Sequence, residues 1–224
     1  MFIITSLNCF LISCRKHILK GKEGQIVHPS QLNENWFLTT KNINFKKIKL
    51  LYVGRIRVEK GIYSFLDMIN KTDLELTIVT SEKKTKLNNI QKNVTVVNFE
   101  NYNDSIIKFY DDHNIFVLPS YYAEGVPKVL LEAAASSCAV ITTDHPGCRD
   151  AILPGETGLT VKPNDVPSLI NGLTKLLSNP ELIKSMGKAG RDLAIERFSV
   201  DKVIDIHYSL YHSFREEKTQ KSSH

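Results

Sequence analysis

Two glutamates, Glu124 and Glu132, stand eight positions apart in the stretch YAEGVPKVLLEAAA, residues 122–135. An ionised carboxylate only accepts hydrogen bonds, which suits it to hold the hydroxyl groups of a sugar or a ribose. Pro127 is well placed as the first residue of a helix, so Glu124 precedes that helix and Glu132 lies about a turn and a half inside it. The two carboxylates therefore need not touch, and they are better explained as two hydroxyl-binding groups than as an acid/base pair.

Each glutamate also has a simpler explanation. Glu132 could be an ordinary charge on a helix surface, but its neighbours in LLEAAA are apolar enough to bury it. A buried carboxylate requires a partner, because removing it from water alone is costly, and this favours a functional role. Glu124 could serve only as a favourable charge near the positive end of the helix dipole.

The turn into the same helix predicts an anion site. Gly125 and Val126 precede Pro127, and the first turn of any helix has N–H groups without an intrahelical acceptor. A helix N-terminus beside a glycine is suited to bind phosphate. The backbone of residues 125–128 is therefore a candidate for phosphate binding.

A second candidate is the basic loop YVGRIRVEKG, residues 52–61. Gly54 follows a strand-like run and permits a tight turn at the carboxyl end of a sheet, where doubly wound folds bind ligands. Arg55 and Lys60 flank the loop, and a guanidinium and an ammonium together suit a diphosphate. A solvated basic loop explains G-R-x-x-x-x-K equally well.

A third polar cluster is TTDHPGCRD, residues 142–150, which also follows a strand-like run. Pro146-Gly147 is a turn signal, and Asp144, His145, Arg149 and Asp150 gather around it. His145 could carry a proton, although a lone loop histidine is more often a bystander, and we favour the bystander.

Apolar runs of strand length alternate with helical periodicity from residue 48 onward, which predicts an α/β fold with a parallel sheet covered by helices. The expected strands are 48–53, 74–80, 94–98, 114–118 and 139–143, with a short one at 158–161. The expected helices between them are about 60–70, 103–112 and 127–137. Beyond Pro163 we expect helices only: one from the cap Asp165 to Leu177, one whose first turn holds Pro180, and an amphipathic one over 199–215.

Composition sets broad limits on function. With 224 residues, 42% of them hydrophobic, the chain can form one full domain with a core. The net charge of +5 fits an anionic ligand or an anionic membrane surface, and nothing indicates nucleic acid. Four cysteines without metal-ligand spacing predict neither a zinc site nor a disulfide framework, so a reducing cytoplasm is expected. The apolar start, residues 1–14, is too short for a membrane span and is wrongly flanked for a signal peptide.

These pieces together resemble the donor-binding half of a GT-B fold glycosyltransferase of family 4, also called glycosyl transferases group 1. The resemblance covers residues 48–213 and follows the order of the family's fragments. They are Gly54-Arg55 with Lys60-Gly61, LPSYYAEGVPKVLLEAAA, AVITTDHPGCRDAI, PGETGLTVKP, MGKAGR and the ERF at 196–198.

The resemblance implies a Rossmann-like domain that transfers a sugar from a nucleotide-sugar donor, a UDP- or GDP-sugar, with retention and without a metal or cofactor. It makes Arg55 and Lys60 the pair that neutralises the departing diphosphate, with Glu132 on the ribose and Glu124 near the donor sugar. The other donor-binding residues that it implies are Gly54, Gly125, Val126, Pro127, Lys128 and Val129, with Asn98 and Phe99 lining the base pocket.

The form of TTDHPGCRDAI resembles members that build capsule, O-antigen or other surface polysaccharides, which implies a saccharide or lipid-linked acceptor met at the inner face of a bacterial membrane. Family members usually have Gly and Pro where this chain has Ser137 and Ala139, so we expect a less sharply broken helix end there.

Only residues 1–47 precede the donor domain, which we place at 48–198, with a crossover helix at 199–215 and a disordered tail at 216–224. Residues 1–47 resemble the end of an N-terminal acceptor domain and the interdomain linker, so the chain resembles a truncated product or a fragment. An alternative is a non-catalytic subunit that binds the donor and pairs with a separate acceptor-domain chain. A dinucleotide-binding protein is disfavoured, because G-x-G-x-x-G does not follow the first strand.

Overall fold

The structure is a computed structural model that describes residues 11–13, 24–26, 32–38, 41, 47–99, 106–122 and 125–221. Its centre is a six-stranded sheet with the strand order β5-β4-β3-β6-β7-β8, in which every neighbouring pair is parallel. The strands are β3 (Lys49–Val53), β4 (Glu75–Thr80), β5 (Val94–Asn98), β6 (Ile115–Leu118), β7 (Ala139–Thr143) and β8 (Gly158–Val161). This confirms the predicted parallel α/β sheet.

The strands form where the sequence has runs of β-branched and aromatic residues, because both faces of a parallel sheet are covered. All residues of β6 and β7 are buried, and so are four of the five in β3. The expected first residue was one position too early for three strands, since Ile48, Leu74 and Asn114 lie just before β3, β4 and β6.

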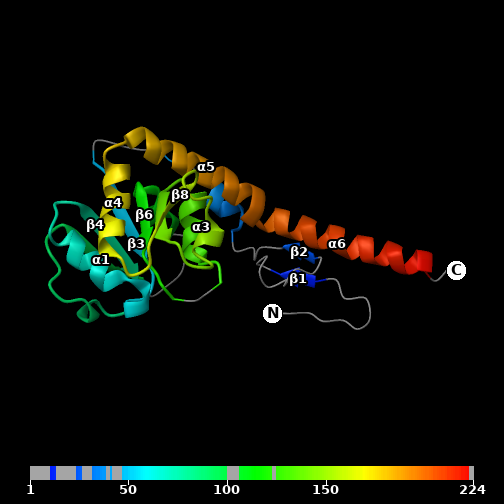
Figure 1. Ribbon diagram of the computed structural model, residues 1–224, viewed down its shortest axis with the longest axis horizontal. Coiled ribbons are helices and arrows are strands. Elements are labelled where there is room, and N and C mark those ends of the chain that lie inside the picture. Colours follow the sequence, from blue (N-terminus) through cyan, green and yellow to red (C-terminus); the bar gives the residue numbers. More distant parts are fainter. Residues whose placement is uncertain are drawn as a thin grey trace.

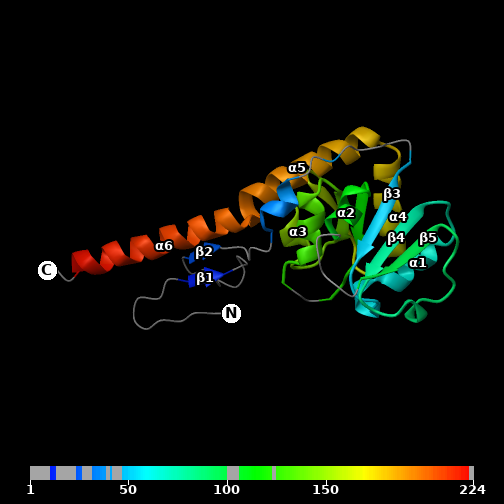
Figure 2. The same cartoon turned by 180° about the vertical axis from the view of Figure 1, so that it is seen from behind.

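Helices cover both faces of the sheet (Figures 1 and 2). On one face lie α1 (Ile62–Ile69) and α4 (Val166–Leu177); on the other lie α2 (Ile106–Asp111), α3 (Lys128–Ala135) and α5 (Pro180–Phe198). The expected helix at 60–70 is divided, because a 3-10 turn, η3 (Val58–Lys60), precedes α1. The expected helix at 103–112 begins at Ile106 as described, and 101–105 lie outside the described residues.

The last helices of the domain begin where the sequence predicts. The Asp165 side chain accepts a hydrogen bond from the Ser168 N–H at 2.9 Å and caps α4, and the Asn179 side chain caps α5 in the same way at 3.1 Å from the Leu182 N–H. Gly187 lies inside α5. A Cβ at this position would overlap the Ser137 carbonyl group after α3, so glycine allows α5 and α3 to pack closely.

Part of the segment that precedes the sheet is fixed to the domain. Arg191 of α5 donates hydrogen bonds of 2.7 Å each to the carbonyl oxygens of Ala135 and Phe37, and the Val200 N–H donates one of 3.0 Å to the Leu32 carbonyl. A short 3-10 turn, η2 (Glu34–Phe37), lies between these anchor points. Residues 32–38 therefore pack on the domain that the six-stranded sheet and its helices form.

The helix α6 (Val200–Lys221) follows α5 directly and extends away from the sheet, beside β1 (Leu11–Ser13) and β2 (Gly24–Ile26), which pair in parallel (Figure 1). It continues beyond the expected end at residue 215, into the segment that we expected to be a disordered tail. Among the described residues no helix is both long and apolar enough to cross a membrane.

Candidate functional site

The candidate site lies beside β3, at the point where the order in which the chain adds strands to the sheet reverses. From β3 the chain moves outward to β4 and β5, and then returns to the other side of β3 to form β6, β7 and β8. The loops after β3 and β6 therefore leave the sheet side by side at its carboxyl edge. In open parallel sheets this crevice is the usual ligand site.

The two loops are held together by backbone contacts. The Tyr121 N–H donates a hydrogen bond of 3.0 Å to the Glu59 carbonyl, and the Ser120 hydroxyl donates to the same oxygen at 3.4 Å. Gly61 has a left-handed φ of 70°, and a Cβ there would overlap the carbonyl oxygen of Pro119. Only glycine fits both requirements, so Gly61 sets how closely the loops approach.

The two predicted diphosphate ligands differ in exposure. Arg55 is exposed, whereas Lys60 at the end of η3 is buried, with 8% of its surface accessible. The Lys60 Nζ lies 5.7 Å from the centroid of the Tyr122 ring, a cation–π contact from the β3 loop to the β6 loop. Gly54 begins the loop, and its N–H donates a 3.0 Å hydrogen bond to the Val79 carbonyl of β4. Lys60 is thus part of the crevice wall, which disfavours the interpretation of this segment as a merely solvated loop.

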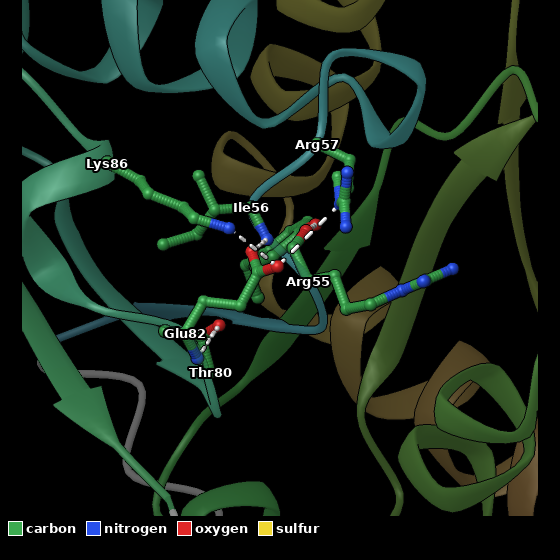
Figure 3. A network of polar contacts seen from close by, with 7 residues as sticks. Arg55, Ile56, Arg57, Thr80, Glu82 and Lys86 are labelled. Carbon is green, nitrogen blue, oxygen red and sulfur yellow. Dashed lines mark hydrogen bonds and ion pairs between the residues drawn. The ribbon is translucent and has the colours of Figure 1, made fainter.

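A residue that the sequence did not identify, Glu82, holds the basic loop (Figure 3). Its Oε2 accepts a 2.6 Å hydrogen bond from the Ile56 N–H, and its Oε1 lies 2.9 Å from Lys86 Nζ and 3.6 Å from Arg57 Nε. Burial by itself would raise the pKa of Glu82, but the hydrogen bonds from Lys86 and Ile56 and the charges of Lys86 and Arg57 outweigh it and lower this pKa. Glu82 is therefore an ionised anchor beside the crevice.

The helix on the β6 side begins one residue later than expected. Pro127 has an extended ψ of 123° and is the N-cap of α3, so Lys128 and Val129 form its first turn. Val126 and Pro127 are buried, whereas Gly125 and Lys128 are exposed. Apart from Gly125 and its two neighbours in the chain, no described atom lies within 4 Å of the position that a Cβ on Gly125 would take. A ligand can therefore approach the backbone closely at the start of α3.

Glu132 is fully buried inside α3, so it is not a helix-surface charge. Its Oε2 accepts a hydrogen bond of 2.8 Å from the Tyr110 hydroxyl of α2, and its Oε1 lies 3.5 Å from Lys128 Nζ. A buried carboxylate with a donor and a cation nearby satisfies the requirement that the sequence raised. The tyrosine partner could not be identified from local spacing, because it belongs to another helix.

The remaining predicted residues are less central. Glu124 lies outside the described residues. Asn98 ends the edge strand β5 and is exposed, and the Phe99 ring packs edge-on against Phe109 of α2 with ring centroids 6.3 Å apart. Phe99 therefore contacts α2, the helix whose Tyr110 binds the Glu132 carboxylate. Asn98 lies at the end of β5, two strands away from β3.

The loop after β7 contains no catalytic arrangement among the residues that the structure describes. His145 Nδ1 lies 3.0 Å from the carbonyl oxygen of its neighbour Pro146, and Arg149 pairs with Asp144 at 3.0 Å, both of them exposed. In the described ranges no group of three or more His, Cys, Asp or Glu side chains could hold a metal ion. These contacts agree with His145 as a bystander.

A cavity of about 560 Å³ lies apart from this crevice, between α1 and α4. Apolar side chains such as Met68, Leu74, Ile170 and Leu173 form much of its wall. None of the predicted donor residues lines it, so we do not assign it to the candidate site.

Comparison with known proteins identifies the family. The family model for glycosyl transferases group 1 matches residues 38–193, well over half of the chain. The chain belongs to this family. The capsular polysaccharide biosynthesis glycosyltransferase CapM of Staphylococcus aureus is 31% identical over 181 residues, 76% of this chain and 47% of CapM. The chain thus spans about half the length of this relative.

Solved structures show the same fold. Sucrose-phosphate synthase from Thermosynechococcus elongatus superposes with a TM-score of 0.73 at 24% identity, over 88% of this chain and 54% of that protein. HepE from Anabaena, solved in complex with UDP and glucose, superposes with a TM-score of 0.69 at 13% identity, over 88% of this chain and 59% of HepE. The predicted fold class, a Rossmann-like half of the glycosyltransferase GT-B fold followed by C-terminal helices, is therefore confirmed.

Proposed function

We propose that this group 1 glycosyltransferase chain binds the nucleotide-sugar donor, a UDP- or GDP-sugar, in the crevice between the β3 and β6 loops. One observation carries the proposal: the loop of Arg55 and Lys60 is bonded through Glu59 to the segment that leads into α3. Two cationic side chains and a helix N-terminus therefore converge at one switch point of the sheet. This combination suits a diphosphate.

In the reaction that we propose, the bond between the anomeric carbon and the diphosphate oxygen breaks, and the diphosphate leaves with the bonding electrons. The anomeric carbon forms a new bond to an acceptor hydroxyl oxygen, whose proton passes to an oxygen of the departing diphosphate, and the configuration is retained. Negative charge grows on the leaving diphosphate, so preorganised cations there stabilise the transition state more than the ground state. Arg55 and Lys60 provide this charge in place of a metal ion.

The ribose hydroxyls bind to Glu132 in this proposal, with Glu124 positioning the donor sugar and Asn98 and Phe99 near the base. Glu132 has no exposed surface, so donor binding requires a neighbouring group to move. Lys128 is suited to this movement, because its side chain is 43% exposed and its Nζ lies within 3.5 Å of the carboxylate. Moving Lys128 toward the donor phosphates would open the carboxylate and add a third cation.

For the acceptor we propose a saccharide or a lipid-linked saccharide of a bacterial surface polysaccharide, met at the inner face of the membrane. The similarity to CapM, whose name assigns it to capsule synthesis, supports the acceptor class. The net charge of +5 is compatible with an anionic membrane surface.

Titration calorimetry with UDP, GDP and their sugar conjugates tests the proposal. We expect one of these series to bind, and Arg55→Ala to weaken binding by about tenfold to a hundredfold, the loss of one charge-assisted hydrogen bond. The matched control is Arg197→Ala at the exposed end of α5, which should bind like the wild type. If the wild type binds no member of either series, the proposed donor site is wrong.

A further inference from the structure

We propose that Glu82 is the positioning residue of the anion-binding loop: it fixes the backbone at Ile56 and engages Arg57, which leaves Arg55 as the arginine for the donor diphosphate. The inference rests on the proposed donor function. It adds a residue from the β4 loop that the family resemblance did not supply.

The first observation is the contact between Glu82 and the loop backbone. The Ile56 N–H donates to Glu82 Oε2 at 2.6 Å, a short distance that is typical of a charge-assisted hydrogen bond. The Ile56 side chain is 2% exposed and belongs to the main core, so this residue is fixed from both its side chain and its backbone. Ile56 directly follows Arg55, so holding Ile56 restrains the direction of Arg55.

The second observation is that Glu82 is itself held in place. Its own N–H donates to the Thr80 hydroxyl at 3.2 Å, and its side chain is only 14% exposed. Lys86, four residues later, lies 2.9 Å from Oε1. A carboxylate that is held at its backbone and at both oxygens is a rigid support for the neighbouring loop.

The third observation is the division between the two arginines. Arg57 lies 3.6 Å from the Glu82 carboxylate, and Figure 3 shows the Arg55 side chain extending away from that carboxylate. Among the residues described, no ion pair or hydrogen bond of the Arg55 guanidinium is present. Residues two apart on an extended backbone share a side. Here the Arg57 N–H donates a 3.1 Å hydrogen bond to the Arg55 carbonyl, so the chain turns at Ile56, the residue whose N–H donates to Glu82, and the two arginines need not share a side. Glu82 thus pairs with Arg57, and the Arg55 guanidinium stays available to bind an anion.

The test uses Glu82→Ala and Glu82→Gln in the same chain, with Glu75→Ala as the matched control. Glu75 is a carboxylate at the start of β4, the strand that Glu82 follows, and it pairs with Lys47 at the opposite, amino edge of the sheet. Two quantities are measured: hydrogen exchange of the Ile56 amide without ligand, and the affinity for UDP and GDP. The first reports on the loop alone, so it is independent of the proposed donor function.

We expect Glu82→Ala to accelerate Ile56 exchange at least tenfold and to weaken nucleotide binding by about tenfold, the effect of one lost charge-assisted hydrogen bond. Glu82→Gln keeps an oxygen that can accept from the Ile56 N–H, so it should recover much of both losses. Glu75→Ala should change neither quantity.

Unchanged Ile56 exchange in Glu82→Ala would overturn the positioning role, whatever happens to binding. Faster exchange with wild-type nucleotide affinity would also overturn it, because the loop would then be held without consequence for the donor. Absence of nucleotide binding in the wild type removes the donor function and, with it, this inference, and that result is recognised before any variant is made.

Discussion

Tyr110 donates a 2.8 Å hydrogen bond to the Glu132 carboxylate, and neither side chain has exposed surface. The Tyr110 ring is itself fixed between Trp36, with centroids 5.5 Å apart, and Phe116, with centroids 5.6 Å apart. The orientation of Glu132, the residue of α3 that we propose binds the ribose, is therefore set by α2 and by the segment that precedes the sheet. Glu132 is not positioned by its own helix alone.

Tyr110→Phe should lower the free energy of unfolding by about 1–3 kcal/mol, because it removes a hydrogen bond to a buried charge and retains the ring packing. Urea denaturation measures the change. Tyr211→Phe is the control: this tyrosine is 66% exposed on α6, and its substitution should have no measurable effect. Equal stability of Tyr110→Phe and the wild type would show that Glu132 does not depend on this hydroxyl.

Gly61→Ala should separate the two loops of the crevice. It adds a left-handed alanine, which costs about 1–2 kcal/mol, and also places a methyl group against the Pro119 carbonyl. Gly155→Ala is a matched control, because Gly155 has a φ of 84° but no described atom within 4 Å of its Cβ position. We expect both to lower the free energy of unfolding, Gly61→Ala by more, and only Gly61→Ala to weaken UDP or GDP binding. Equal losses of stability would argue against the close approach of the loops.

The buried His113 should make stability depend on pH in mildly acidic solution. Burial lowers the pKa of His113, as do the charges of Lys49 and Lys41, against the opposing effects of the Phe109 carbonyl and Asp112. As the pH falls through about 6.5, His113 of the unfolded chain takes up a proton while His113 of the folded chain stays neutral. The His113 contribution to the free energy of unfolding is therefore complete above this pH and decreases as the pH falls toward the folded pKa. Urea denaturation from pH 7.5 to 5.5 measures the slope.

The control for this slope is His113→Gln, which removes the titrating ring. Its free energy of unfolding should be lower than that of the wild type at pH 7.5, because contacts to Thr77 and Phe109 at 2.7 and 2.5 Å are altered. The gap should narrow as the pH falls, because only the wild type loses the His113 contribution. Parallel slopes in the two proteins would contradict the assignment.

The features that the sequence predicted well are those that depend on local patterns. Strand β7 follows from the largely β-branched run AVITT, and the starts of α4 and α5 follow from the cap Asp165 and from Pro180 in the first helical turn. Glu82 was missed because its principal partner, the Ile56 N–H, is 26 positions earlier in the chain, and its own segment, TSEKKTK, has the composition of a solvated loop. Tyr110 was missed for the same reason, since no local spacing relates it to Glu132. The sequence thus predicts candidate donor-binding residues, and the contacts that orient these residues appear only in three dimensions.

The end of α3 corrects one expectation and gives the last prediction. Without the usual glycine we expected a less sharply broken helix end, yet the helix stops at Ala135. Ser137 takes the left-handed φ of 55° that ends it, and the Cys138 N–H bonds to the Ala133 carbonyl at 2.9 Å. Serine at this φ costs about 1–2 kcal/mol, more than glycine loses through its greater freedom in the unfolded chain. Ser137→Gly should therefore raise the free energy of unfolding by about 0.5–1 kcal/mol.

Ser178→Gly is the matched control for this change. Ser178 caps α4 with an ordinary φ of −78°, so glycine there relieves no strain and should lower the free energy of unfolding by about 0.5–1 kcal/mol. Opposite signs of the two changes in the free energy of unfolding, measured by urea denaturation, would verify that the backbone of Ser137 is strained in the conformation that ends the helix. A loss of stability in Ser137→Gly similar to that in Ser178→Gly would mean that other contacts of Ser137 outweigh its backbone conformation.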